Sequence, residues 1–508
     1  MDFRIGRRPL FGAALAGSLV SLVGCSSGSR DSASEAQVRN LVIGATASPD
    51  ALDPSRNTAA AISQALLYNV YETLLKVDAK GDFQPLLAKS WTQSDDGLSY
   101  TFTLEPNAKF ASGTVLDATA VKTSLDRIIG DSKSLATLKA QLAAIGTVTA
   151  SDATTLVITL RHRDNDLLYF LAQTAGIVYD PSKLSTLDVT PAGSGPFVFS
   201  AWNQGDSLSL GRNANYWGTP TKFDKASFKY YADANAENAA LSSGDLDLIT
   251  NDQAPQSLGQ FKDTSRFTIL DGTTMAEVVM GFNHSRAVFK DIRVRQAINY
   301  AINRKELLQT VADGHGLLIG SMVPPTDPWY EDLSNTYPYD PQKARSLLAE
   351  AGHSSDLNLA LRVPTLPYAT AAATFVTSAL KDVGITVTVD QLDFPARWID
   401  EVLTKSNYDM TIVGHVEGRD ITKWADPDYY WHYDNAEFRT LIEQAQTGPS
   451  DEQVGFMKKA AELLATDAAA DFLYLLANLV VTRADLSGVA QNLTSDSFDL
   501  TTISSKDF

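Results

Sequence analysis

The second half of the chain alternates between strand and helix patterns, and this alternation restricts the possible fold more than any other feature. Strands are predicted by β-branched and apolar residues at 357–363, 385–389 and 408–413. Apolar periodicity predicts helices over 292–311, 341–351, 369–382 and 396–404. Because strands joined through helices pair by right-handed crossovers, we expect an α/β sheet covered on both faces. Ligands bind such sheets beyond the carboxyl ends of strands, which points to the residues from Gly414 onward.

The first half has a weaker pattern, in which strands are easier to recognise than helices. A short strand is predicted at 41–45, and turn residues follow it at 48–50. Residues 60–75 have helical periodicity, so we expect one helix there. Further strands are predicted at 100–104, 155–160 and 228–231. A chain of 508 residues is long enough for two or three compact units.

Six short blocks together identify a family. They are 104–127 (LEPNAKFASGTVLDATAVKTSLDR), 193–197 followed by 210–218, 241–247, 281–298, 339–352 and 435–438. Each block alone is weak, but their order and spacing over most of the chain make the joint signal specific. On these blocks the chain resembles family 5 of the bacterial extracellular solute-binding proteins, which contains oligopeptide-, dipeptide- and nickel-binding components of ABC importers.

The resemblance implies an α/β fold with two lobes, of the periplasmic-binding-protein type II kind, in its large class with an extra inserted subdomain. Lobe I is expected at 40–80, 188–275 and 481–508, with the inserted subdomain at 81–187 and lobe II at 276–480. Two chain segments form the hinge between the lobes. The resemblance further implies that solute binds between the lobes, and that a permease recognises the closed form.

The segment 414–432, GHVEGRDITKWADPDYYWH, is the richest candidate for ligand contacts, because charges and aromatic rings follow a predicted strand. A solute buried between two lobes needs partners for its charges. In peptide-binding relatives an aspartate here holds the free amine, and the resemblance places Gly418 at that position. Glu417 or Asp420 can replace it from a neighbouring position, or the ligand lacks a free amine. His415 stands where oligopeptide-binding relatives have a tryptophan.

Further residues complete the predicted ligand site. Arg419 and Lys423 can meet a carboxylate or phosphate, the arginine in bidentate fashion, although each charge can equally belong to a solvated loop. Trp424 and Phe394 are candidates for an aromatic wall, with core packing as the alternative. From the other lobe, the residues after the first strand, beginning at Thr46, are expected to offer backbone contacts.

No cofactor is predicted, and the metal-site signal is weak. Of the six histidines, His415 and His432 share the candidate loop, but no histidine pair has helical ligand spacing and the one cysteine lies far away. A nickel or other metal complex is an alternative ligand, because part of the family carries one. The body of the chain has no GxSxG elbow, phosphate loop or HExxH motif, so a binding protein is favoured over an enzyme.

The N-terminal residues indicate export. Three arginines precede an uncharged apolar run at 9–23, which is long enough for a signal-peptide core and short for a membrane span. The run ends in LVGC at 22–25, which resembles a bacterial lipobox. We therefore predict a signal peptide over 1–24, a lipid on Cys25 and a flexible tether over 25–39. The pair Arg7-Arg8 leaves twin-arginine export open beside the ordinary route.

Charge and composition limit the partners. The net charge of −18 argues against nucleic acid or an anionic membrane surface as the partner. The sequence thus predicts a monomeric lipoprotein held outside the cell membrane, which captures a peptide or similar small polar solute for an ABC permease. A lipoprotein that senses a solute without transporting it is a further alternative.

Overall fold

The computed structural model describes residues 39–57, 59–354 and 357–506. The described chain belongs to one compact unit that begins at Arg39. The predicted signal peptide over 1–24 and the lipidation site Cys25 lie outside the described residues, as does all of the predicted tether except Arg39. None of the described helices combines the length and the apolar character needed to cross a bilayer.

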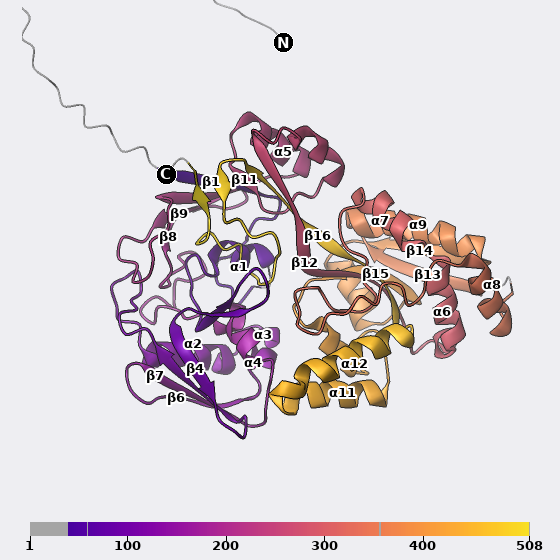
Figure 1. Ribbon diagram of the computed structural model, residues 1–508, viewed down its shortest axis with the longest axis horizontal. Coiled ribbons are helices and arrows are strands. Elements are labelled where there is room, and N and C mark those ends of the chain that lie inside the picture. The colour runs from indigo at the N-terminus through magenta and orange to yellow at the C-terminus, as the bar shows by residue number, and fades with distance from the viewer. Residues whose placement is uncertain (1–38, 58, 355–356, 507–508) are drawn as a thin grey trace, which may run out of the picture. The chain divides into compact units, whose positions relative to one another are not determined.

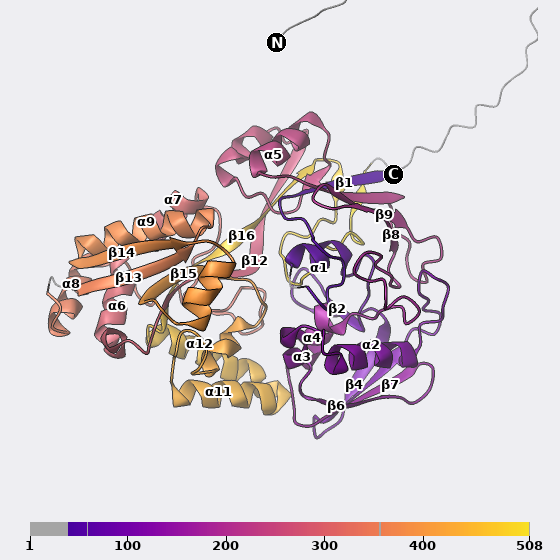
Figure 2. The same ribbon diagram turned by 180° about the vertical axis from the view of Figure 1, so that it is seen from behind.

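One mixed sheet of ten strands runs through the described residues (Figure 1). Its order is β14-β13-β15-β12-β16-β11-β1-β10-β9-β8. The two central strands are long, β12 at Phe267–Phe282 and β16 at Ala470–Arg483, and they pair antiparallel along most of their length. Strands on one side of this pair form a first lobe, and strands on the other side form a second lobe. β12 and β16 are thus the two segments that join the lobes, as both ribbon views show (Figures 1 and 2).

The first lobe combines part of this sheet with a smaller one. Its part of the large sheet is β1 (Asn40–Ala45), β10 (Lys225–Tyr230), β11 (Leu248–Ile249), β9 (Ser207–Arg212) and β8 (Phe197–Asn203). The smaller sheet has the order β4-β5-β7-β6, with β4 at Ala88–Gln93, β5 at Ser99–Leu104, β7 at Thr155–Leu160 and β6 at Ile145–Ala150. A two-stranded ribbon pairs β2 (Leu75–Val77) with β3 (Phe83–Pro85). One hydrophobic core includes buried residues of all three sheets.

Helices surround these strands. They are α1 (Ala60–Leu66), α2 (Ala118–Gly130), α3 (Ala136–Gln141), α4 (Leu167–Leu171) and α5 (Ala234–Ser243). Asp117 caps α2 by accepting a hydrogen bond from the N–H of Ala120 at 3.0 Å. Such a cap satisfies a backbone donor that the helix itself leaves free.

The second lobe has helices on both faces of its sheet, as the sequence predicts. Its strands are β13 (Leu357–Pro364), β14 (Ile385–Leu392) and β15 (Met410–His415). Side chains alternate along β12, so that Val278, Met280 and Phe282 join the core on one face and Val279 the core on the other. The first face carries α6 (Ile292–Ala301), α7 (Arg304–Ala312), α8 (Pro341–Glu350) and α9 (Pro367–Asp382). The second carries α10 (Ala396–Trp398), α11 (Ala436–Thr447) and α12 (Gln453–Thr466).

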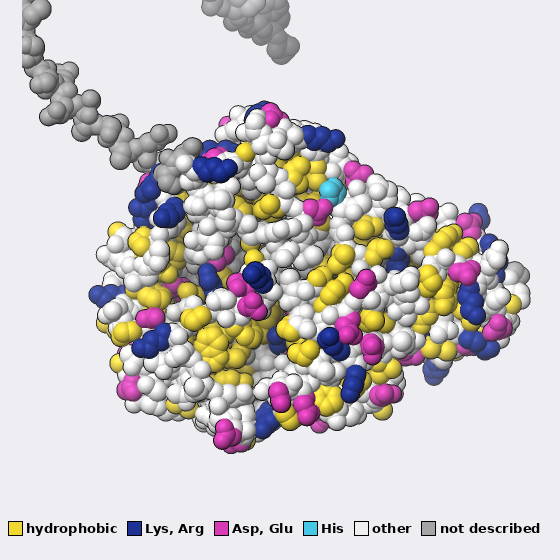
Figure 3. All heavy atoms as spheres, in the orientation of Figure 1, with side chains coloured by type: hydrophobic (Ala, Val, Ile, Leu, Met, Phe, Trp, Pro, Cys, Tyr) yellow, Lys and Arg dark blue, Asp and Glu magenta, His cyan; other side chains and the backbone are white. Residues whose placement is uncertain are grey.

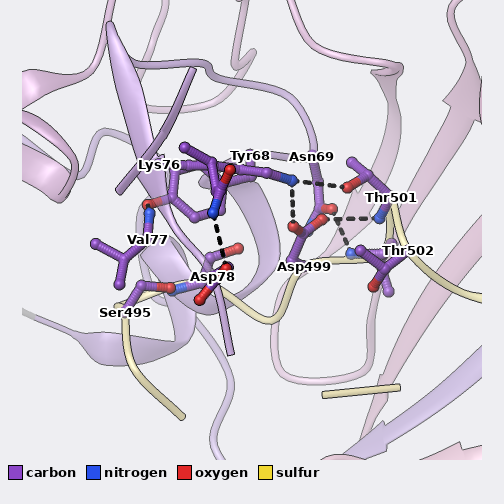
Figure 4. A network of polar contacts seen from close by, with 12 residues as sticks. Tyr68, Asn69, Lys76, Val77, Asp78, Ser495, Asp499, Thr501 and Thr502 are labelled. Carbon is purple, nitrogen blue, oxygen red and sulfur yellow. Dashed lines mark hydrogen bonds and ion pairs between the residues drawn. The ribbon is translucent and has the colours of Figure 1, made fainter. Parts of the chain in front are cut away.

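The last part of the described chain returns to the first lobe (Figure 4). Asn69 donates its side-chain amide to a backbone carbonyl of this stretch at 2.9 Å and accepts the N–H of Leu500 at 2.9 Å. The Lys76 ammonium lies 2.9 Å from the Asp499 carboxylate. Leu500 is fully buried in the same core as Leu41. Residues from both ends of the described chain therefore stabilise one lobe.

Two helix predictions are wrong in extent. The helix expected over 60–75 ends at Leu66, because Tyr68 takes a left-handed backbone conformation and the carbonyls of Asn69 and Val70 accept hydrogen bonds from a distant segment. The helix expected over 292–311 is broken between α6 and α7, where Asn303 caps the second helix. The domain boundaries at 80/81, 187/188, 275/276 and 480/481 stay predictions.

Candidate functional site

The predicted ligand segment leaves the sheet at the edge where ligand sites of α/β proteins lie. β13 pairs in parallel with both β14 and β15, so the carboxyl ends of the three strands share one edge. β15 ends at His415, and the chain then forms a short 3-10 turn, η5, at Asp420–Ala425. The loop 416–432 is therefore positioned by the sheet of the second lobe.

Charges within this loop are largely paired with each other. The imidazole of His415 lies 2.9 Å from the Tyr430 hydroxyl and 3.5 Å from the Asp420 carboxylate. The Lys423 ammonium lies 3.0 Å from Asp420 and 2.8 Å from Glu417. Burial alone lowers the pKa of Lys423, but the neighbouring negative charges, Asp420 first, outweigh it and raise this pKa. Lys423 is thus held charged inside the loop.

Glu277 on β12 belongs to the same cluster and was missed by the sequence analysis. It stands opposite His415 in the β12–β15 register and is 3% exposed. Its Oε2 has no hydrogen-bond partner among the described residues. Burial, with the nearby charges of Asp420 and Asp327, holds the pKa of Glu277 well above its usual value. Its sequence signal is one acid inside the otherwise apolar run at 275–282 of this strand.

Arg419 connects the two lobes. Its guanidinium forms an ion pair with Asp166, which lies just before α4 in the first lobe. The same guanidinium lies 4.4 Å from the ring centre of Tyr169 and 4.9 Å from that of Trp329. Asp166 also accepts hydrogen bonds from two glutamines of the second lobe, at 3.0 and 3.3 Å. The pair is buried, with 8% and 3% of the two side chains exposed.

A second contact between the lobes lies one residue earlier. A Cβ atom added to Gly418 would stand 1.8 Å from the hydroxyl oxygen of Tyr169. No side chain fits at position 418 while the lobes hold this arrangement. The resemblance places the amine-binding aspartate of peptide-binding relatives at position 418, where this chain has glycine. Tyr169 of the first lobe occupies the space that an aspartate side chain at 418 would need.

The two aromatic candidates lie in different surroundings. Trp424 is 1% exposed and stacks on Trp431, with 3.8 Å between ring centres, inside the core of the second lobe. Phe394 is 44% exposed and lies beside Trp398, just after β14. Of the two, only Phe394 presents its ring at the surface of the sheet edge.

The two remaining candidates are Thr46 and His432. Thr46 follows β1 and is half-buried. His432 bonds to the Ser406 hydroxyl at 2.8 Å. Among the described residues, no group of three histidine, cysteine or acidic side chains could hold a metal ion.

A cavity of about 150 Å³ has walls from both lobes. The first lobe supplies Val77, Gly81, Asp82, Phe83, Tyr169 and Thr494, and the second supplies Thr326, Asp327, Pro328 and Arg419, with Met275 from β12. Of the residues that the sequence predicts for the site, Arg419 borders this cavity. Asp327 and Tyr169 were missed, since nothing distinguishes them from ordinary loop and helix residues in the sequence.

Comparison with known proteins decides the family. A model described as bacterial extracellular solute-binding proteins, family 5 middle, matches residues 82–439. The chain belongs to this family. Family 5 proteins with curated descriptions include the glutathione-binding protein GsiB of Escherichia coli K12, which is 31% identical over 309 residues, or 59% of each chain. The heme-binding protein A of Haemophilus influenzae is 32% identical over 297 residues, or 54% of each chain. The chain thus aligns with less than two thirds of the length of these relatives.

Solved structures of family 5 share the fold. NikA of Brucella suis in complex with Fe(III)-EDTA superposes with a TM-score of 0.80 at 21% identity, over 92% of this chain and all of that one. DppA of Helicobacter pylori in complex with the peptide STSA gives 0.75 at 21% identity, over 92% and 98%. These likenesses, with the architecture described above, confirm the predicted two-lobed α/β fold.

Proposed function

We propose that this chain is the extracytoplasmic substrate-binding component of an ABC importer, which captures a peptide or similar small polar solute between its lobes and delivers it to a permease. The observation that carries this proposal is the cavity walled by both lobes of a family 5 fold. The protein acts as a monomer, with lobe I at 40–80, 188–275 and 481–508, the inserted subdomain at 81–187 and lobe II at 276–480.

The charge of the protein is consistent with a solute-binding protein and argues against a protein that binds polyanions. Lys, Arg, Asp and Glu side chains are interspersed on the face seen in Figure 3, with apolar side chains between them. The chain as a whole carries a net charge of −18. The net negative charge repels nucleic acid, and a net charge far from zero favours solubility.

The proposal is tested by a solute screen on the mature protein. Dipeptides, tripeptides, glutathione, heme and nickel–histidine complexes are added in turn while thermal unfolding is followed, and a bound solute raises the melting temperature. We expect one peptide-like class to bind with Kd of about 1 μM or below, about −8 kcal/mol, in calorimetry. Asp434→Asn, an exposed acid paired with Arg439, is the control that leaves binding unchanged.

The screen separates the alternatives. Stabilisation by a nickel complex and by no peptide would replace the peptide proposal with the metal-complex alternative. No stabilisation by any solute would contradict a binding function. Loss of solute uptake in a strain without the chain distinguishes an importer component from a sensor, whose loss leaves uptake intact. A native mass spectrum of the same sample tests the monomer.

The proposed anchor is a lipid on Cys25, supported by the LVGC sequence at 22–25 and the apolar run before it. A tether of small polar residues would leave the folded body free to turn above the membrane. Replacing Cys25 by serine removes the thiol that carries the lipid, so we expect the protein to move from the membrane fraction to the soluble fraction. Ser26→Ala is the matched control, and an unchanged distribution of Cys25→Ser between fractions contradicts the anchor.

A further inference from the structure

The lobes meet where the segment before α4 reaches the end of α11 (Figures 1 and 2). Asp166 lies at this contact, and both of its carboxylate oxygens have partners in the second lobe. One oxygen accepts hydrogen bonds from the Arg419 guanidinium and from Gln453, the latter at 3.0 Å. The other oxygen accepts a hydrogen bond from Gln446 at 3.3 Å. The positive charge of Arg419 is therefore already paired with Asp166.

Asp164 is a second acid of the same segment. Its carboxylate accepts the backbone N–H of Asp166 at 2.9 Å, so two acidic residues are held close together. Asn165, between them, donates its backbone N–H to the Gln446 carbonyl at 2.9 Å and its side-chain amide to the Ala445 carbonyl at 2.8 Å. These bonds hold the segment that carries Asp164 against the second lobe.

The charges around Asp164 do not balance its own. Burial raises the pKa of Asp164 to about 6, and the Asp166 charge adds to the rise. The N–H of Asp166 and the charges of His162 and Arg419 oppose the rise with smaller effects on this pKa. Tyr100 of β5 interacts with the same carboxylate and brings no positive charge. Asp164 is thus easier to protonate in this contact than in water.

Asp327 is a third acid, and it comes from the second lobe. It lies between α7 and α8 and borders the cavity together with Arg419. From the first lobe, Asp82 and Tyr169 border the same cavity, and neither brings a positive charge. Burial raises the pKa of Asp327 to about 6; the Arg419 charge opposes the rise and Asp166 adds to it.

Closing the lobes thus gathers several carboxyl groups around one guanidinium. Asp164 and Asp166 come from the first lobe and Asp327 from the second, and the Asp327 charge also acts on Glu277 of β12. One guanidinium balances one carboxylate, so the other acids are stabilised in the contact by holding a proton. Carboxyl groups whose pKa is higher in the closed form than in the open form bind protons on closing.

We propose that closure of the lobes takes up protons, so that a mildly acidic medium favours the closed form and an alkaline medium favours the open form. Asp164 and Asp327 are the groups that titrate, because opening parts the first from α11 and the second from Asp166 and admits water to both. The advantage of the closed form is complete below about pH 4 and is lost as the pH rises through about 6. Such a switch belongs to the lobes themselves and goes beyond the capture of any particular solute.

The test follows the radius of gyration of the solute-free mature protein by small-angle X-ray scattering from pH 5 to pH 8. An acid with a pKa of about 6 in the closed form and about 4 in the open form shifts the closing equilibrium about tenfold over this range, and two acids shift it about 100-fold. We therefore expect a smaller radius at pH 5 than at pH 8. The same series on Gly418→Ala, whose lobe contact is weakened by the added Cβ, covers a wild type that is closed throughout the range.

Two substitutions remove the titration. Asp164→Asn and Asp327→Asn keep the shape of the protonated acid and abolish its charge, so the double variant should be compact at both pH values. Each single variant should retain about a tenfold shift of the closing equilibrium. Asp332→Asn, a change at an exposed acid in the same segment as Asp327, is the matched control and should keep the full pH dependence of the wild type. If the double variant does not fold, the wild type and the two single variants decide.

The outcomes are separate from those of the solute screen. An equal radius at pH 5 and pH 8 in both the wild type and Gly418→Ala overturns the inference, and so does a larger radius at pH 5. A folded double variant that keeps the pH dependence of the wild type also overturns it. Because no solute is present, each of these results leaves the proposed importer role standing. Conversely, a screen in which no solute binds contradicts that role and leaves the proton-linked closure intact.

Discussion

Gly418 lies where the two lobes touch, and the space around it limits which residues position 418 can accept. The hydroxyl of Tyr169, from the other lobe, occupies the place that any side chain at 418 would need, with 1.8 Å between that oxygen and an added Cβ. Tyr169 cannot easily move away, because its ring also lies against the Arg419 guanidinium. A side chain at 418 therefore competes with the contact between the lobes.

Gly418→Ala should separate the lobes, because overpacking of this kind costs about 1–3 kcal/mol. We expect a larger radius of gyration for the solute-free variant than for the wild type in small-angle X-ray scattering. Tyr169→Ala combined with Gly418→Ala should remove the clash and bring the value back toward that of Tyr169→Ala alone. Gly455→Ala on α12, where an added Cβ meets no atom within 4 Å, is the control. Identical scattering of Gly418→Ala and wild type would show that the contact is not maintained in solution.

At the scale of elements, α5 carries an acid on its buried face. Glu237 is fully buried, neither carboxylate oxygen has a partner among the described residues, and the helix packs against β1 at Gly44. Burial, with a smaller effect of Asp252, raises the pKa of Glu237 from 4.5 to about 8. The folded state therefore prefers the protonated acid, whereas the unfolded chain ionises it near its ordinary pKa.

Because the pKa of Glu237 is higher in the folded protein than in the unfolded chain, the free energy of unfolding falls as the pH rises. Glu237 contributes stability in full below about pH 4.5, and this contribution is lost as the pH rises toward and through about 8. Relative to wild type, Glu237→Gln should gain a few kcal/mol in unfolding free energy at pH 8.5, at about 1.4 kcal/mol per unit of pKa shift, and little at pH 4. Urea unfolding at the two pH values measures this difference. Asp245→Asn, an exposed change of the same charge, should show no such pH trend.

Most elements of the second lobe were predictable because their signals are local. Alternating or β-branched runs mark β13, β14 and β15, and α6 begins at Ile292, where the apolar periodicity of its sequence begins. The errors arose where distant residues override periodicity. The helix that begins at Ala60 stops because the carbonyls of Asn69 and Val70 bond to residues more than a hundred positions away. Apolar spacing alone contains no information about such partners.

At the scale of the whole molecule, the lobes are joined by β12 and β16 and also meet at their far edges. Asn165 of the first lobe donates its side-chain amide to the Ala445 carbonyl at the end of α11, at 2.8 Å, and its backbone N–H to Gln446 at 2.9 Å. With the Arg419–Asp166 pair, these bonds hold the cavity between two walls. The arrangement is a closed one, as a captured solute would require.

The wall of this cavity that the second lobe supplies through Arg419 could be predicted from the sequence, whereas the wall that the first lobe supplies could not. The loop 414–432 was recognisable because charges and rings follow a strand, and Arg419 lies in it. Asp166, Tyr169 and Asp327 come from segments with no shared pattern, and only the fold brings them to Arg419. A site assembled between lobes is a property of tertiary structure, so its second wall has no local sequence signal.

The return of the final stretch to the first lobe has a consequence for the order in which the protein is made. β1 needs β10 and β11 as neighbours, and the core around Leu41 is completed by Leu500 and Ile503. Synthesis makes β1 well before Leu500 and Ile503, so the interior of the first lobe stays incomplete until these late residues have been made. The second lobe, apart from the two joining strands, is formed by one continuous stretch of chain, so its residues are all made before the last part of the first lobe. The first lobe is thus the first to begin synthesis and the last to have its core complete.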